Sequence, residues 1–104
     1  MSTPEILAEI KRRVAAADPT AQVVLYGSYA RGEQGPESDI DLLILVDKEA
    51  LSSEEETGIM YPLFHLEYDT GVIISPRVQT RKAWFNRPFV TPFFSNVQRE
   101  GITL

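Results

Sequence analysis

Two aspartates near the middle of the chain have the side-chain type and the spacing that a metal-binding site requires. Asp39 and Asp41 stand two positions apart at the start of an apolar run. Side chains alternate along a strand, so both carboxylates point to one face, about 7 Å apart along the chain. Two carboxylates that face one spot repel each other unless a cation or a proton lies between them. This spacing is typical of a site for a divalent metal ion.

A glycine-serine turn precedes the aspartates by about ten residues and directly follows a short apolar run. Gly27 allows the backbone to approach a ligand closely, and Ser28 offers its N–H and its hydroxyl to a phosphate. Arg31, one helical turn further on, could add a forked cation to the same phosphate. We expect two adjacent strands to bring this turn and the aspartates together.

The first half of the chain predicts one helix and the two strands that carry these residues. The helix is expected from Thr3 to about Ala17, with Thr3 as its cap and Pro4 in its first turn. Strands are expected at Gln22–Tyr26 and Asp39–Val46. The second strand is almost continuously apolar, which indicates a strand covered on both faces by helices.

The second half predicts a helix, a strand and two short helices. The helix begins at Ser52 or Ser53 and is bent or shortened by Pro62. A strand at Val72–Ser75 is closed by Pro76, and the short helices lie near 80–86 and 91–100, with a Schellman-type finish after the last one. The order of elements predicts one α/β (α+β) domain over residues 1–104, a small mixed β-sheet with helices packed on it.

Composition limits the classes of function. The 104 residues include no cysteine and one histidine, and the formal net charge is −5. These counts exclude a disulfide scaffold and a thiolate zinc site, and favour carboxylate sites for hard ions such as Mg²⁺. An acidic chain is a poor general binder of nucleic acid. The absence of a signal-like N-terminus and of a membrane-length apolar run predicts a soluble, cytoplasmic protein with no membrane contact.

The stretch from Gly27 to Gly32, together with Ser38 to Leu42, resembles the signature of the polymerase-beta-type nucleotidyltransferase superfamily. The short length and the order of elements resemble its minimal nucleotidyltransferase branch. Members of that branch are often paired with a separately encoded helical HEPN protein. The resemblance implies a polymerase-beta-like nucleotidyltransferase fold.

The resemblance also implies a reaction and its parts. A nucleoside monophosphate, AMP from ATP, would move to a hydroxyl acceptor while pyrophosphate leaves. Asp39 and Asp41 would hold two Mg²⁺ ions, or Mn²⁺, while Gly27 and Ser28 would bind the β- and γ-phosphates with help from Arg31. The acceptor would be a tyrosine on a HEPN-type toxin, which would make this chain an antitoxin.

Active relatives carry a third carboxylate on the next central strand, and this sequence departs from that pattern. If the strand covers 69–75, its alternate positions leave either Ile73 or Ser75 in the expected place. Asp69 has the same parity but comes about one dipeptide early, and Glu67 comes earlier still. Asp69 is therefore the candidate for a third catalytic carboxylate.

Two other functions stay open. The missing acid is compatible with a catalytically degenerate chain that binds and neutralises its partner, and with a nucleotide-sensing module. A basic cluster of Arg77, Arg81 and Lys82 after the third strand is either a surface face or a contact for a triphosphate or an acidic partner.

Overall fold

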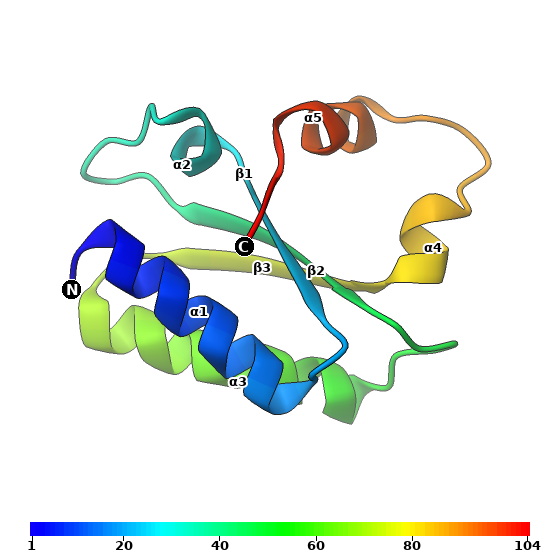
Figure 1. The fold of residues 1–104 in the computed structure, drawn as a ribbon, viewed down its shortest axis with the longest axis horizontal. Coiled ribbons are helices and arrows are strands. Elements are labelled where there is room, and N and C mark those ends of the chain that lie inside the picture. The colour runs from blue at the N-terminus through cyan, green and yellow to red at the C-terminus, as the bar shows by residue number, and fades with distance from the viewer.

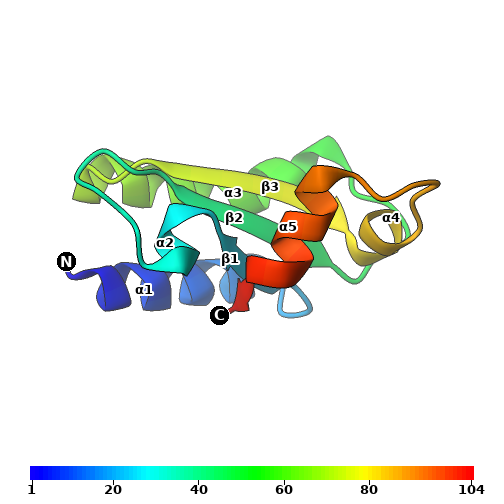
Figure 2. The ribbon, with the colours of Figure 1, turned by 90° about the horizontal axis from the view of Figure 1, so that it is seen from above.

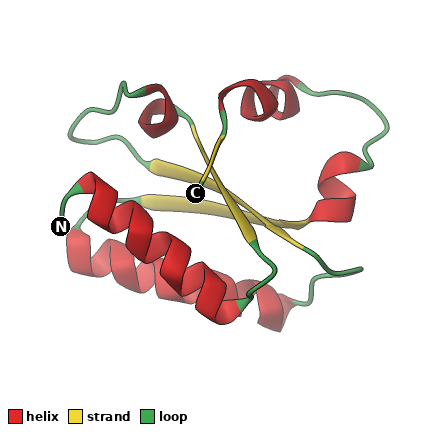
Figure 3. Ribbon diagram, viewed as in Figure 1, coloured by secondary structure: helices red, strands yellow, loops and turns green.

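The computed structural model describes all residues, 1–104, and its strands form one mixed sheet with helices around it (Figures 1 and 3). The strand order is β3-β2-β1-β4. Strand β1 (Gln22–Tyr26) runs antiparallel to β2 (Ile40–Val46) and to β4 (Ile102–Thr103). Strand β2 runs parallel to β3 (Ile74–Thr80). The predicted α/β class, with a small mixed sheet, is confirmed.

Helices cover both faces of the sheet. Helices α1 (Thr3–Ala17) and α3 (Ser53–Thr70) lie side by side on one face, as Figure 1 shows. The other face carries α2 (Ser28–Arg31) and α5 (Pro92–Glu100), with α4 (Arg81–Phe85) towards one end (Figure 2). None of the helices combines the length and the apolar character needed to cross a bilayer.

Strand β2 lies at the centre of the core because helices cover it on both sides, as its apolar run predicts. Its side chains point alternately into two clusters, one shared with α1 and α3 and one shared with α4 and α5. The first cluster contains Ile40, Leu42, Ile44 and Val46, and the second contains Leu43 and Leu45 with Trp84 and Val97.

The two long helices begin at capping boxes. Ser52 caps α3 together with Glu55, as predicted. At α1 the cap is Ser2 and not Thr3: the Ser2 hydroxyl accepts from the Glu5 N–H, and the Glu5 carboxylate accepts from the Ser2 N–H. Glu5 lies at the third helical position only when Ser2 is the cap, so Thr3 is the first residue of the helix and not its cap.

The boundary between α3 and β3 differs from the prediction. Helix α3 continues through Pro62 to Thr70 and ends where Gly71 takes a φ of 76°, a left-handed cap. Strand β3 then continues through Pro76 to Thr80. Proline cannot donate to a sheet, but β3 is an edge strand with a neighbour on one side only, where proline is tolerated.

The end of the chain also differs. Gly101 has φ −62° and ψ 140°, so α5 does not end in a Schellman motif. The extended backbone instead leads into β4, and the Leu104 N–H donates to the Val23 carbonyl. A Cβ at position 101 would lie 2.5 Å from the Val97 carbonyl oxygen, so this close approach to α5 requires glycine.

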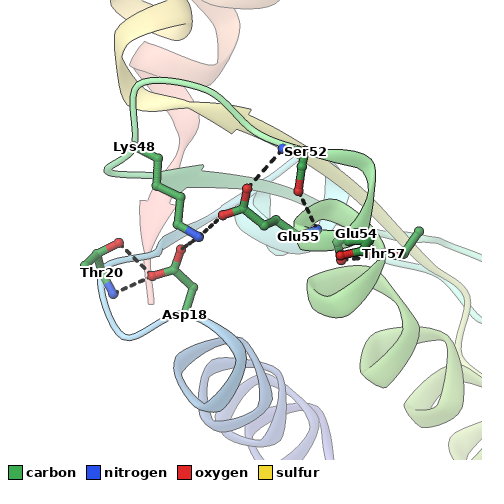
Figure 4. Close-up of polar contacts among 7 residues, drawn as sticks. All are labelled: Asp18, Thr20, Lys48, Ser52, Glu54, Glu55 and Thr57. Atoms are coloured by element: carbon green, nitrogen blue, oxygen red, sulfur yellow. Dashed lines mark hydrogen bonds and ion pairs between the residues drawn. The ribbon is translucent and has the colours of Figure 1, made fainter.

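A polar cluster ties the end of α1 to the start of α3 (Figure 4). Lys48 Nζ lies between the carboxylates of Asp18 and Glu55, 3.6 Å from Asp18 Oδ2. The N–H and the hydroxyl of Thr20 donate to Asp18 Oδ1 at 2.9 and 2.7 Å. Asp18 is 6% exposed and its Oδ2 accepts no hydrogen bond, so the Lys48 charge compensates a buried carboxylate.

Candidate active site

Strand β2 brings the two predicted carboxylates to the face of the sheet that carries α2 and α5. Asp41 is the second residue of β2, and Asp39 lies just before the strand begins. Partial burial and the negative charge of Asp39 raise the pKa of Asp41, while the positive charge of Arg31 acts in the opposite direction. A cation between the carboxylates would remove this unfavourable interaction.

Gly27 forms the wall of the site next to Asp41. Its φ of 75° and ψ of −156° define a conformation that is open almost only to glycine. A Cβ at this position would lie 2.3 Å from Asp41 Oδ2, so a side chain here would displace the carboxylate. The spacing in the sequence predicted that the turn and the aspartate would meet, and the structure brings them together.

Ser28 and Arg31 are the first and last residues of the short helix α2. The N–H groups of the first turn of a helix have no acceptor within it, which leaves those of Ser28 and Tyr29 without a partner inside α2. The Arg31 guanidinium is already paired: Nε lies 3.2 Å from Glu33 and Nη1 lies 3.1 Å from Glu100. Hydrogen bonds to these carboxylates raise the pKa of Arg31.

The predicted third carboxylate is absent from this group. Asp69 lies exposed on the last turn of α3 and not on a strand, because the helix continues to Thr70. Glu67 is engaged elsewhere, since its Oε1 accepts from the Ile74 N–H at 2.8 Å. The parallel register pairs Asp41 with Ser75, so Ser75 and not Ile73 occupies the place where the resemblance implies an acid.

The residues at hand fit a divalent metal ion of the Mg²⁺ type. The Ser75 hydroxyl donates to Asp39 Oδ2 at 3.4 Å, which adds a third oxygen beside the two carboxylates. No group of three or more His, Cys, Asp or Glu is arranged to hold a metal by itself. Mg²⁺ commonly binds through one or two carboxylates and the phosphates of a substrate, which matches this donor set.

Two further side chains border the site. Tyr26 pairs with Asp41 across β1 and β2, and its ring meets Phe93 of α5 edge to face at a centroid distance of 5.4 Å. The Arg77 guanidinium lies 4.6 Å from the centroid of Phe93. Burial and the charge of Asp41 raise the pKa of Tyr26, and the charge of Arg77 opposes them.

Tyr26 is not among the site residues predicted from the sequence, and Arg77 was predicted as part of a basic cluster. Counting alternate positions back from the Gly27 turn could have put Tyr26 on the same face as Asp41. The cluster is divided in the structure: Arg77 lies on β3, whereas Arg81 and Lys82 begin α4 and Lys82 pairs with Glu49.

Residues 7–90 match the family model of the nucleotidyltransferase domain. The chain therefore belongs to this family, and its mixed sheet is that of a polymerase-beta-like nucleotidyltransferase fold. The predicted resemblance to the minimal nucleotidyltransferases is confirmed.

Two similar curated proteins come from Methanocaldococcus jannaschii. One, named "Putative protein adenylyltransferase MJ0141", is 32% identical over 105 residues, which cover 98% of this chain and 98% of the relative. The other, "Putative protein adenylyltransferase MJ0604", is 36% identical over 83 residues, which cover 80% of this chain and 76% of the relative.

One similar solved structure is described as "Crystal structure of the toxin-antitoxin with AMP-PNP". Its TM-score with this chain is 0.63 at 18% sequence identity. The match covers 98% of this chain and 72% of that chain. The match shows a shared fold.

Proposed function

We propose that this chain transfers AMP from ATP to a hydroxyl acceptor. The observation that carries the proposal is the carboxylate pair Asp39 and Asp41, with Asp41 against Gly27, in a chain of the nucleotidyltransferase family. Two curated relatives are named as protein adenylyltransferases, which supports AMP as the transferred group and a protein as its acceptor.

In this reaction the acceptor oxygen attacks the α-phosphorus, and the bond to the bridging oxygen of the β-phosphate breaks. Pyrophosphate leaves and the hydroxyl proton passes to water. The N–H groups at the start of α2, which have no acceptor within the helix, and the Ser28 hydroxyl hold the β- and γ-phosphates. Arg31 joins them by exchanging Glu33 or Glu100 for a phosphate oxygen.

Asp39 and Asp41 would hold Mg²⁺, with Mn²⁺ as a substitute, in the pair of ions that the family resemblance implies. The bound metal would neutralise negative charge on the reacting phosphates. Burial and the negative charge of Asp39 both raise the pKa of Asp41, so a cation beside it would favour its charged form.

The proposed acceptor is a tyrosine on a partner toxin of the HEPN type, which would make the chain an antitoxin. The solved structure of similar fold is described as a toxin-antitoxin with AMP-PNP, an ATP analogue, which supports both a nucleotide and a toxin partner.

A second candidate is a chain that binds and blocks its partner without chemistry. Ser75 favours it, because a hydroxyl stands opposite Asp41 where a third carboxylate is implied. A hydroxyl supplies less charge to a metal than a carboxylate does.

Label transfer separates the two candidates. The protein is incubated with Mg²⁺, the product of the neighbouring gene, and ATP labelled in the α- or the γ-phosphate. AMP transfer predicts that only the α-label reaches the partner and that Asp41→Asn abolishes transfer. The exposed Asp47, changed to Asn, is the matched control. A partner that is inhibited but unlabelled would support the blocking candidate instead.

A further inference from the structure

The order of the strands locates the side of the site from which the acceptor approaches. Strand β2, with Asp41, lies between β1 and β3. The Gly27–Ser28 turn follows β1, whereas Ser75 and Arg77 belong to β3, so these two sets lie on opposite sides of Asp41. In an in-line transfer, the attacking and leaving oxygens lie on opposite sides of the reacting phosphorus. With pyrophosphate held at the Gly27–Ser28 turn, the acceptor approaches over β3.

The strand register places Arg77 on the face that carries the carboxylates. Asp41 pairs with Ser75 in the parallel ladder, and Arg77 comes two positions later, about 7 Å further along the same face. The aromatic contacts agree with this placement: Arg77 stacks on Phe93, and Phe93 packs edge-on against Tyr26, the partner of Asp41 on β1.

Arg77 is an exposed cation without a carboxylate partner. It forms no ion pair in the chain, whereas Arg31, the other arginine near Asp41, is held by Glu33 and Glu100. A guanidinium that stacks on an aromatic ring keeps its N–H groups available to an anion in the plane of the fork. The acceptor side therefore offers a fixed, unneutralised positive charge.

We propose that Arg77 binds a carboxylate next to the acceptor hydroxyl, so that the preferred acceptor is a hydroxyl side chain within an acidic segment of a protein. This inference rests on the proposed function and deepens it by naming the class of acceptor. A single arginine suits one carboxylate. A nucleic acid would bring many phosphates to a chain of net charge −5. The same net charge disfavours acidic peptides in general, so a preference for them requires a local cation.

The test uses two fluorescent peptides that each contain one tyrosine and differ only in flanking residues, glutamates in one and lysines in the other. Their dissociation constants are measured by fluorescence anisotropy in the presence of Mg²⁺ and a non-hydrolysable ATP analogue. We expect the wild type to bind the glutamate peptide about threefold to fivefold more tightly, the size of an exposed ion pair. Arg77→Ala should remove this preference and Arg77→Glu should reverse it.

The matched control is Lys11→Glu, which makes the same charge change on α1, on the opposite face of the sheet. It should keep the preference, and circular dichroism checks that every variant is folded. The inference is overturned if the wild type prefers the lysine peptide or binds neither, or if Arg77→Glu keeps the wild-type preference. Tighter binding of a single-stranded oligonucleotide, lost in Arg77→Glu, would also overturn it. Binding of the ATP analogue to the wild type is recorded separately, and its absence would count against the proposed function.

Discussion

Individual residues show how tightly the candidate site is built. Gly27 combines a backbone conformation that side chains rarely adopt with an open space that Asp41 Oδ2 fills. Gly32, only five positions later, also has a positive φ of 71°, but no atom lies within 4 Å of the place of its Cβ. Both glycines therefore have a backbone conformation that is unfavourable for a side chain, but only at Gly27 would a side chain also collide with the Asp41 carboxylate.

This contrast predicts the behaviour of two alanine variants. Gly27→Ala and Gly32→Ala should each lower the free energy of unfolding by about 1–3 kcal/mol, because both force alanine into an unfavourable conformation. Only Gly27→Ala should also weaken the binding of Mg²⁺ and ATP, since its Cβ displaces the Asp41 carboxylate. Urea unfolding and calorimetry measure the two quantities. Equal ATP affinity in both variants would show that the contact with Asp41 has no role in binding.

Asp41 itself predicts a response to metal. A divalent ion that binds only the folded protein raises its melting temperature by mass action. We expect Mg²⁺ or Mn²⁺ to raise the melting temperature of the wild type and of Asp47→Asn, but not of Asp41→Asn. Identical metal responses in all three proteins would exclude a metal site at Asp41.

At the scale of elements, the sequence predicted the bounds of those helices and strands that local residue patterns determine. Helix α1 and strand β1 have the expected bounds, because apolar periodicity and turn residues mark them locally. The bounds of β3 were wrong, because whether Pro76 ends a strand depends on its position at the sheet edge, which is a tertiary property.

The candidate site, too, could be predicted only in part from the sequence. The meeting of Gly27 with Asp41 could be predicted, because two short strands joined by a defined loop carry them. The place of Ser75 opposite Asp41 depends on the register of a parallel pair, whereas Asp69 lies outside the site because α3 continues to Thr70. That register is set by packing over the whole sheet, so spacing alone could not give it.

The β2–β3 register predicts the effect of restoring an acid. Ser75→Asp places a carboxylate opposite Asp41 and should raise Mg²⁺-dependent transfer, by about tenfold or more if the acid serves as a catalytic base. Ile73→Asp puts the same charge just before the strand and should have little effect. Asp69→Ala should also change the rate little, because Asp69 is exposed on α3. Label transfer from ATP measures all three, and a rate lost in Asp69→Ala would show that this carboxylate reaches the site.

At the scale of the whole molecule, a charged cluster holds the helical layer together at the end of α1. Lys48 follows β2, the strand of the candidate site, and pairs with Asp18 after α1 and with Glu55 in α3. Hydrogen bonds from Lys48 and Ser52 lower the pKa of Glu55 to about 2 from its ordinary value of 4.5. The folded state therefore favours the charged form of Glu55.

This shift predicts part of the acid sensitivity of the fold. The stabilisation from ionised Glu55 is fully present above its ordinary pKa of 4.5 and is lost as the pH falls towards about 2. Glu55→Gln should lower the free energy of unfolding at neutral pH and should make that free energy fall less steeply between pH 4.5 and about 2. Glu37→Gln, in an exposed loop, should do neither. Urea unfolding at a series of pH values measures this. Parallel stability curves for wild type and Glu55→Gln would contradict it.

The central claim is that Asp39 and Asp41, beside the Gly27–Ser28 turn, hold a metal-bound nucleotide. Calorimetric titration of ATP into the wild type and into Asp41→Asn, with and without Mg²⁺, tests it most directly. We expect the wild type to bind one ATP only when Mg²⁺ is present, and Asp41→Asn to bind at least about tenfold more weakly. ATP binding that is independent of Mg²⁺, or as tight in Asp41→Asn as in the wild type, would contradict the claim.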